Sequence, residues 1–319
     1  MTLGVAVAGL GAIGRLHAVN LARHVPGARL ARLVERVPRL ARAVGEELAV
    51  PSSTSYEEAL GDPAVRAVVI ATPTPAHAEM VEQAAAAGRH VFCEKPLSLD
   101  PESGVRAARA FEAAGLCLQV GFHRRFDPDW VAAKRHVDAG DVGDVELLRI
   151  SHRNRCHPHA GRTDRLGSLF VDMSIHDLDS ARWLVGEVEA LTAVGGEKTA
   201  AIVLQFAGGG LGIIDNTRVA GYGFDCTAEL IGRKATLRVG SGWRPVAIEL
   251  LTPAGALVRL PADHIERHSP AYLAEVRHFV ESIRSGEPPA VGAEDAQAAL
   301  VLALAAERSC RERLPVRPG

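Results

Sequence analysis

Residues Val5 to Gly14 read V-A-V-A-G-L-G-A-I-G, and this stretch decides the fold. The apolar run Val5–Ala8 predicts a buried strand, and the G-x-G-x-x-G hexamer after it opens a helical pattern over Ile13–Arg23. In this setting the glycines allow a tight turn, let the backbone approach a pyrophosphate and let the helix pack on the sheet. The helix N-terminus then faces the phosphates. The stretch therefore predicts a dinucleotide-binding Rossmann domain.

The acidic residue expected of such a domain is Glu35, at the end of the second predicted strand and 21 residues beyond Gly14. A carboxylate there accepts hydrogen bonds from both ribose hydroxyls of NAD and repels the 2′-phosphate of NADP. Arg36 follows it and could instead pair with that phosphate. We therefore expect NAD as the cofactor, with NADP as the weaker alternative.

The first third of the chain alternates β-rich runs with alanine-rich helical periods, which is the pattern of a doubly wound parallel sheet. We expect strands at 30–34, 67–71, 90–93 and 116–122, and helices at 38–48, 76–87 and 101–114. This pattern predicts an α/β domain over residues 1–121.

Beyond residue 121 strands follow strands with glycines between them, which favours a C-terminal α+β domain with a large, mostly antiparallel open sheet. We expect strands at 147–152, 201–206, 211–217, 224–231, 235–239, 247–251 and 257–260, and helices at 128–139, 168–185, 270–285 and 293–311. The second predicted domain is 122–319, and its last helix could pack back on the first domain.

Composition narrows the function classes. The 319 residues are 47% hydrophobic with a formal net charge of −2. This charge does not indicate binding to nucleic acid or to a membrane. No apolar run approaches the ~18 residues of a membrane span. The five cysteines are scattered and odd in number, which is typical of reduced thiols. We expect a cytoplasmic protein that acts on a small molecule.

Two segments place candidate substrate-binding and cofactor-binding residues at the carboxyl edge of the predicted parallel sheet. Glu94-Lys95-Pro96 follows the strand at 90–93, and Pro96 restricts the backbone of Lys95 to extended or turn conformations. An ammonium held beside a nicotinamide can meet a substrate oxygen, which favours a polyol or sugar dehydrogenase. Thr72-Pro73 starts a stiff loop that can support the ribose and nicotinamide of the cofactor. Alternatively, Thr74 and Pro75 could simply start a helix.

Asp172 and His176 are four residues apart and would share one face of the predicted helix. Histidine suits the removal of a hydroxyl proton, and the aspartate could orient it. The alternative is an ordinary surface pair. A metal site that also uses His152, His157 and His159 is a further alternative, but no H-E-x-x-H or C-x-x-C spacing supports it, so we expect no metal.

Together these motifs resemble one family, the Gfo/Idh/MocA-type oxidoreductases, named after glucose–fructose oxidoreductase, inositol dehydrogenase and a rhizopine-catabolism protein. The resemblance covers nearly the whole chain. The matching residues are G-x-G-x-x-G with His17, Glu35, Thr72-Pro73 with His77, Glu94-Lys95-Pro96, Gly121-Phe122-x-Arg124-Arg125-Phe126-Asp127 and Asp172-x-x-x-His176-Asp177. It implies a Rossmann domain and a C-terminal domain whose open sheet is buried between the subunits of a dimer or tetramer.

Within the family, residues 120–127 and His152-Arg153-Asn154 are most similar to myo-inositol 2-dehydrogenases. This similarity implies NAD-dependent oxidation of a secondary hydroxyl of a cyclic polyol or sugar. Phe224 departs from it, because inositol dehydrogenases tend to carry a tyrosine there. Other sugar or amino-sugar dehydrogenases and ketoreductases therefore remain alternatives, and so does a non-catalytic nucleotide-sensing protein.

The resemblance also implies roles for single residues. Lys95 would bond the reacting hydroxyl, His176 would be the general base and Asp172 would orient it. The expected substrate contacts are Lys95, Arg124, Asn154, Asp172 and His176. The expected cofactor contacts are Gly9, Gly11, Ala12, Ile13, Gly14, Glu35, Arg36, Thr72, Pro73, Glu94 and Lys95.

Overall fold

The computed structural model describes residues 2–155, 168–240, 249–252, 255–258 and 261–318, and the chain forms two compact units. The first unit joins residues 1–123 to 270–298, and the second joins 124–269 to 299–319. Neither unit is contiguous in sequence, whereas the domains predicted from the sequence are the single stretches 1–121 and 122–319.

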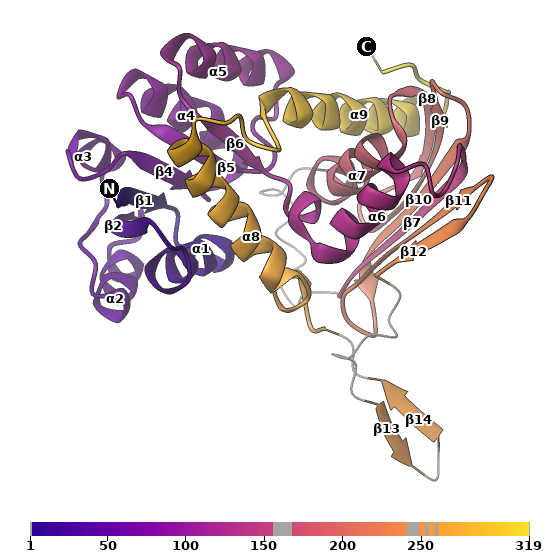
Figure 1. Ribbon diagram of the computed structural model, residues 1–319, viewed down its shortest axis with the longest axis horizontal. Coiled ribbons are helices and arrows are strands. Elements are labelled where there is room, and N and C mark those ends of the chain that lie inside the picture. Colours follow the sequence, from indigo (N-terminus) through magenta and orange to yellow (C-terminus); the bar gives the residue numbers. More distant parts are fainter. Residues whose placement is uncertain (1, 156–167, 241–248, 253–254, 259–260, 319) are drawn as a thin grey trace. The chain divides into compact units, whose positions relative to one another are not determined.

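The first unit contains a six-stranded sheet in the order β3-β2-β1-β4-β5-β6, in which every pairing is parallel (Figure 1). The strands are β1 (Leu3–Ala8), β2 (Ala28–Val34), β3 (Ser52–Ser53), β4 (Ala67–Ile70), β5 (His90–Glu94) and β6 (Leu118–Gly121). The helices are α1 (Ala12–Arg23), α2 (Pro38–Leu48), α3 (Tyr56–Gly61), α4 (His77–Ala86) and α5 (Pro101–Ala114). This strand order is the one that Rossmann domains use, and it reverses between β1 and β4, where dinucleotides bind. The predicted Rossmann fold is confirmed.

Helix α8 (His264–Ser285) brings a late part of the chain into the core of this unit. Val276 and Phe279 on α8 are fully buried in one apolar cluster with Val5 of β1 and Phe92 of β5. The helix starts six residues before the predicted Pro270 and has a non-helical residue at His268, just ahead of that proline.

The second unit is built on a six-stranded mixed sheet in the order β12-β11-β7-β10-β9-β8. Its strands are β7 (Val145–Arg155), β8 (Val188–Gly195), β9 (Thr199–Phe206), β10 (Leu211–Ala220), β11 (Asp225–Gly232) and β12 (Thr236–Val239). The other elements are α6 (Pro128–Asp138), α7 (Ile175–Val185), α9 (Ala293–Glu312), which starts in the first unit, and a separate hairpin of β13 (Glu249–Thr252) and β14 (Gly255–Val258). Among the described strands of this sheet, only β7 and β10 pair in parallel, so the sheet is mostly antiparallel, as predicted.

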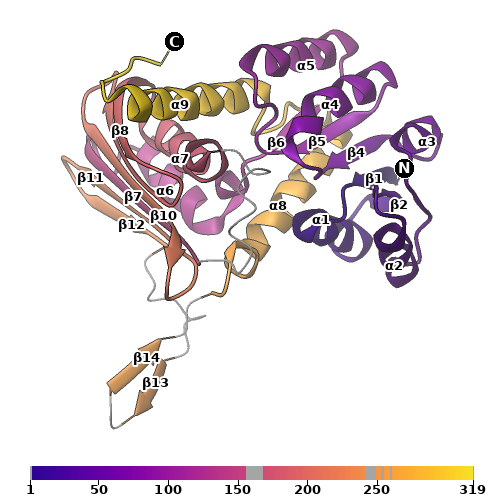
Figure 2. The same cartoon turned by 180° about the vertical axis from the view of Figure 1, so that it is seen from behind.

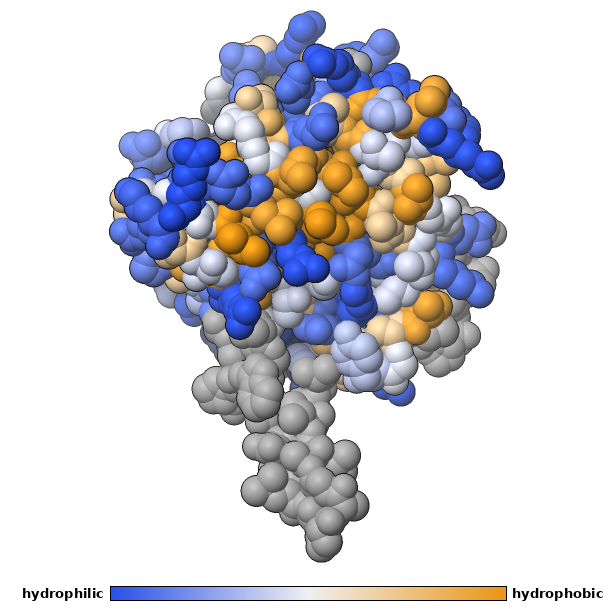
Figure 3. All heavy atoms as spheres, turned by 90° about the vertical axis from the view of Figure 1, so that its right-hand side faces the viewer, coloured by the Kyte–Doolittle hydropathy of each residue, from blue (hydrophilic) through white to orange (hydrophobic). Residues whose placement is uncertain are grey.

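The two faces of this sheet differ. On one face, residues such as Ile150 and Ile202 are fully buried, and α7 packs against β7 (Figure 2). On the other face Val203 and Ile213, directly opposite one another on β9 and β10, are 44% and 37% exposed. Apolar side chains gather across this open face (Figure 3). No helix in the described part of the chain is long and apolar enough to cross a membrane.

The helix predicted over 168–185 is not one α-helix. A π-helical turn, Phe170–Ser174, precedes α7. Asp172 lies in this wider turn and His176 lies in the first turn of α7. Such π-turns are rare and are often found at functional sites.

Candidate active site

Each of the three glycines in the dinucleotide loop is required for a different structural reason. Gly9 has φ of +87°, and a Cβ there would lie 2.5 Å from the main-chain oxygen of Ala71. A Cβ on Gly14 would lie 1.8 Å from the main-chain oxygen of Gly9, so the turn and the packing of α1 both require glycine. Around Gly11, at the N-cap of α1, no described atom outside Gly11 and its two chain neighbours lies within 4 Å of the Cβ position. The main chain there can be approached closely, as a pyrophosphate requires.

Glu35 is held in front of this loop. Its Oε2 accepts a hydrogen bond of 2.8 Å from the main-chain N–H of Leu10, and its Oε1 accepts one of 3.0 Å from Val37. A carboxylate has about four lone-pair positions, so further hydroxyl donors can still bind. Arg36 is exposed beside it. The open Gly11 main chain, the first turn of α1 at Ala12 and Ile13, and the fixed carboxylate together suit NAD.

His77 connects the two loops in which Thr72-Pro73 and Lys95 lie. Its Nε2 lies 2.8 Å from the carbonyl oxygen of Thr72, and its Nδ1 lies 2.8 Å from that of Pro96. The side chain is buried, and burial lowers the pKa of this imidazole. Sequence reasoning gave His77 no role of its own, because nothing local shows that it bridges two loops.

Lys95 follows directly after β5 and is half-buried, and the Lys95–Pro96 peptide bond is cis. Oε1 of Glu94 lies 2.8 Å from Nε2 of His17, and the contact of Glu94 with cofactor stays a prediction. His17 is fully buried in α1.

In the second unit, Asp172 is paired with a residue that the sequence did not indicate. Arg218 Nη2, on β10, donates a hydrogen bond of 2.7 Å to Asp172 Oδ2. His176 is buried at 8% exposure, and its carbonyl oxygen accepts a bond of 2.7 Å from Ser180. Asp172 and His176 therefore belong to the second unit, and Lys95 belongs to the first.

Arg124, predicted to hold a substrate hydroxyl, is built into the interior of the second unit. It is 2% exposed, and its guanidinium bonds Asp177 through Nη1 at 2.5 Å and lies 2.9 Å from Nδ1 of His152 through Nη2. Asn216 donates a further bond of 2.8 Å to Asp177. These contacts favour a structural role for Arg124.

Asp177 is the centre of that network. Burial alone raises the pKa of its carboxyl, but the charges of Arg124 and His152 outweigh burial and lower the pKa to about 2. An ionised, fully buried carboxylate is stable only when it is paired and hydrogen-bonded in this way.

Asn154 lies on β7, one residue before the strand ends, and its contact with substrate stays a prediction. His157 and His159 lie outside the described residues. Phe224 is buried and contacts the ring of His152 edge-on, with 5.5 Å between the ring centroids. It offers no hydroxyl to a ligand.

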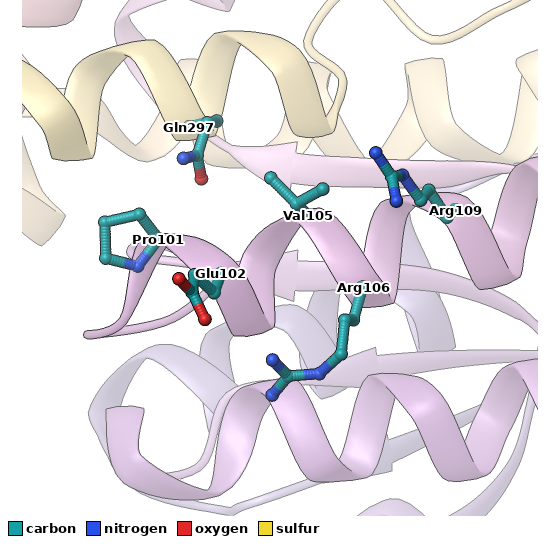
Figure 4. Close-up of a pocket in the computed structure, with 6 residues that line it drawn as sticks. All are labelled: Pro101, Glu102, Val105, Arg106, Arg109 and Gln297. Atoms are coloured by element: carbon teal, nitrogen blue, oxygen red, sulfur yellow. The ribbon is translucent and has the colours of Figure 1, made fainter. Parts of the chain in front are cut away.

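A surface hollow beside α5 lies away from this chemistry. Glu102, Val105, Arg106 and Arg109 line it together with Pro101 and Gln297 (Figure 4). None of the predicted site residues lines it, and we assign it no role.

Two family models match this chain. The model described as "Oxidoreductase family, NAD-binding Rossmann fold" matches residues 3–122, and that of the "GFO/IDH/MocA C-terminal domain" matches residues 130–238. The chain belongs to the Gfo/Idh/MocA oxidoreductase family. The predicted family, the oxidoreductase class and NAD as cofactor are thereby confirmed.

Similar family members span the whole chain. It is 35% identical over 326 residues to scyllo-inositol 2-dehydrogenase (NAD(+)) of Bacillus subtilis, covering 98% of this chain and 95% of the relative. It is 36% identical over 329 residues to myo-inositol 2-dehydrogenase of Thermotoga maritima, covering 98% of both chains. The solved structure of scyllo-inositol dehydrogenase from Lactobacillus casei with bound NAD(H) and scyllo-inositol has a TM-score of 0.94, 29% identity and 99% coverage of both chains.

Proposed function

We propose that this protein oxidises a secondary hydroxyl of a cyclic polyol with NAD, and that the substrate is myo-inositol. The observation that carries the proposal is the open Gly11 main chain beside a fixed Glu35, at the edge of the sheet where Lys95 follows β5. Full-length relatives named as inositol 2-dehydrogenases support the substrate class.

In the proposed mechanism, NAD accepts the hydride when it is bound. The ammonium of Lys95 donates a hydrogen bond to the reacting oxygen and stabilises the negative charge that grows there. His176 takes the hydroxyl proton on its imidazole, because neutral imidazole is a base near neutral pH. Asp172 fixes the orientation and basicity of His176, and Arg218 partly neutralises Asp172.

Two features bear on substrate choice. Arg124 is occupied by Asp177, so we assign the contacts with neighbouring ring hydroxyls to Asn154 rather than to Arg124. Phe224 supplies no hydroxyl, which keeps other sugars and amino sugars as a second candidate class.

The test is a screen of myo-inositol, scyllo-inositol, other cyclitols, aldoses and amino sugars with NAD and with NADP, followed by absorbance of the reduced nicotinamide. We expect the highest kcat/KM with NAD and myo-inositol. A stronger response to an aldose or amino sugar would move the substrate to the second class. NAD binding without turnover of any of these compounds would favour a nucleotide-sensing role.

We also propose a homo-oligomer, dimer or tetramer, that buries the open face of the second sheet. Val203, Leu211 and Ile213 are 44%, 47% and 37% exposed there, and such a patch usually marks an interaction surface. A second copy of the chain supplies an identical apolar face, as an isologous interface requires. We propose a cytoplasmic location, which the free thiols of the four described cysteines support.

A further inference from the structure

Three ionisable side chains meet inside the first unit, next to Lys95 in sequence. His17 comes from α1, Glu94 from the end of β5 and Glu275 from α8, which lies beside α1 in both ribbon views (Figures 1 and 2). One nitrogen or oxygen of each lies within 4.8 Å of those of the other two. His17 and Glu275 are fully buried, and the side chain of Glu94 is 14% exposed.

Glu275 is the unusual member. Neither of its carboxylate oxygens has a hydrogen-bond partner among the described residues. Leaving an ionised carboxylate in that position would cost several kcal/mol or more, and such a group takes up a proton instead. Burial raises the pKa of Glu275 well above its ordinary value, and the charge of Glu94 raises it further.

The other groups that face Glu275 do not supply a compensating charge. Gln119 from β6 is neutral and donates its Nε2–H to the main-chain oxygen of Glu275 at 2.8 Å. His17 from α1 already has Nε2 at 2.8 Å from Oε1 of Glu94. Glu94 from β5 is itself a carboxylate, so it can accept a proton donated by Glu275 but cannot stabilise a second negative charge.

A divalent cation is the competing explanation, because one histidine and two carboxylates can bind zinc or manganese. A metal-bound histidine almost always donates its second ring N–H to a carboxylate, carbonyl or water. Nδ1 of His17 is buried and has no hydrogen-bond partner in the described part of the chain. The imidazole of His17 packs edge-on against the rings of Phe92 and Tyr272, at centroid distances of 5.1 and 6.1 Å. These surroundings favour a shared proton over a metal.

Glu94 is also enclosed from the side of β6. A Cβ on Gly121 would lie 3.1 Å from Oε2 of Glu94 and 3.1 Å from the ring of Phe92, so a larger residue would push the carboxylate aside. The main chain of Glu94 leads directly into Lys95. The position of this carboxylate therefore bears on where the proposed catalytic ammonium points.

We propose that Glu275 is held protonated and is a positioning residue, which together with His17 clamps Glu94 and so fixes Lys95. Its O–H donates to Glu94 through one water, and His17 donates from Nε2 to the same carboxylate. The link to Lys95 rests on the proposed function, whereas the protonation of Glu275 does not.

The protonation state is tested without substrate, by infrared difference spectroscopy on the whole protein at neutral pH. We expect a carbonyl band of a protonated carboxylic acid in the wild type that is absent in Glu275→Gln. Glu281→Gln is the matched control, since Glu281 lies on the same helix with its side chain 67% exposed, and it should leave the band in place. A wild type without the band overturns the proposal, and so does stoichiometric zinc or manganese that Glu275→Gln removes.

Turnover tests the positioning role. Glu275→Gln keeps a neutral donor of the same shape and should keep kcat near the wild-type value. Glu275→Leu removes the donor and should lower kcat on the order of 10²-fold with little change in NAD affinity, because small displacements of a catalytic group are costly. If the Glu275→Gln variant is folded but loses as much activity as the Glu275→Leu variant, the positioning role is wrong. If the Glu275→Leu variant does not fold, the kcat of the Glu275→Gln variant alone tests the positioning role. Should the wild type oxidise no polyol, the proposed function fails and the infrared result still stands by itself.

Discussion

Asp177 Oδ1 accepts a 2.5 Å hydrogen bond from Arg124 Nη1, and both side chains are almost completely buried in the second unit. The family resemblance implies that Arg124 contacts the substrate, and this buried ion pair favours a structural role for it. The difference matters because a structural pair and a substrate contact respond differently to mutation.

Removing the charge of Asp177 should destabilise the protein. Asp177→Asn leaves the buried guanidinium of Arg124 without its counter-charge, which typically costs about 3–5 kcal/mol. Replacing both partners, as in Arg124→Met with Asp177→Leu, should recover much of that loss. Urea unfolding measures both. If Arg124→Met instead left stability unchanged and raised KM for the polyol, the substrate role implied by the family resemblance would be correct.

Acid should destabilise the second unit through His268. Burial lowers the pKa of this imidazole to about 4, although its hydrogen bond to Asp127 acts in the opposite direction. The unfolded chain binds a proton at an ordinary histidine pKa of about 6.5, so the folded state loses stability as the pH falls from about 6.5 to 4. Replacing His268 with Gln should flatten the dependence of unfolding free energy on pH in that window. An unchanged slope would show that other groups cause the acid sensitivity.

The elements that the sequence predicted well have local signals at their ends. Helix α5 has the predicted bounds because Asp100 caps it through the N–H groups of Glu102 and Ser103, Pro101 opens it, and Gly115 ends it with φ of +63°. The glycine loop and Glu35 were likewise visible in the sequence, because the backbone approach and the carboxylate each require one residue type at one spacing.

The parts of the site that the sequence did not predict depend on pairing between residues far apart in the chain. Arg218 lies 46 residues from Asp172, and nothing near either one indicates the bond. Asn216 reaches the Asp177 network because β10 pairs in parallel with β7, which sets Asn216 opposite His152. A strand register of this kind has no local signature, and neither does the π-turn that carries Asp172.

Cofactor choice should depend on Glu35. Its carboxylate, fixed by the N–H groups of Leu10 and Val37, repels a 2′-phosphate, so NAD should give the higher kcat/KM. Glu35→Ser should narrow the preference by weakening NAD and by leaving exposed Arg36 available to the phosphate of NADP. Glu47→Ser serves as the control, since Glu47 pairs with Arg15 on the surface of the same unit. A wild type that prefers NADP would contradict the assignment.

The open sheet face should control assembly. Ile213→Lys places a charge in the middle of the exposed apolar patch, and light scattering after size-exclusion chromatography should show a shift toward monomer. Leu314→Lys is the control, because Leu314 is 59% exposed but lies outside the sheet. The open-face interface would be wrong if both variants kept the wild-type mass.

Loss of Lys95 should affect chemistry more than cofactor binding. Lys95→Ala removes the charge that stabilises the reacting oxygen, and the rate should fall by about 10²–10³ or more. NAD affinity, measured by fluorescence quenching or calorimetry, should stay near the wild-type value because the glycine loop holds the phosphates. A variant that bound NAD poorly but kept kcat would make Lys95 a cofactor residue.

The pH profile should reveal the general base. If His176 accepts the hydroxyl proton, kcat/KM for polyol oxidation rises with pH through one ionisation and then levels off. His176→Ala should remove that acidic limb and lower the rate by roughly 10²–10⁴. An unchanged profile in this variant would transfer the base role to Lys95.

Substitutions of Asp172 and of Arg218 should shift the acidic limb of the kcat/KM profile in opposite directions. Asp172→Asn removes a negative charge that favours the imidazolium of His176, so the limb should shift to lower pH. Arg218→Leu removes the cation that neutralises Asp172, as its 2.7 Å bond indicates, so the limb should shift to higher pH. The apparent pKa belongs to the coupled group and not to His176 alone. Arg233→Leu on the exposed surface is the control, and shifts of the same sign in the Asp172 and Arg218 variants would show that their ion pair does not act on the base.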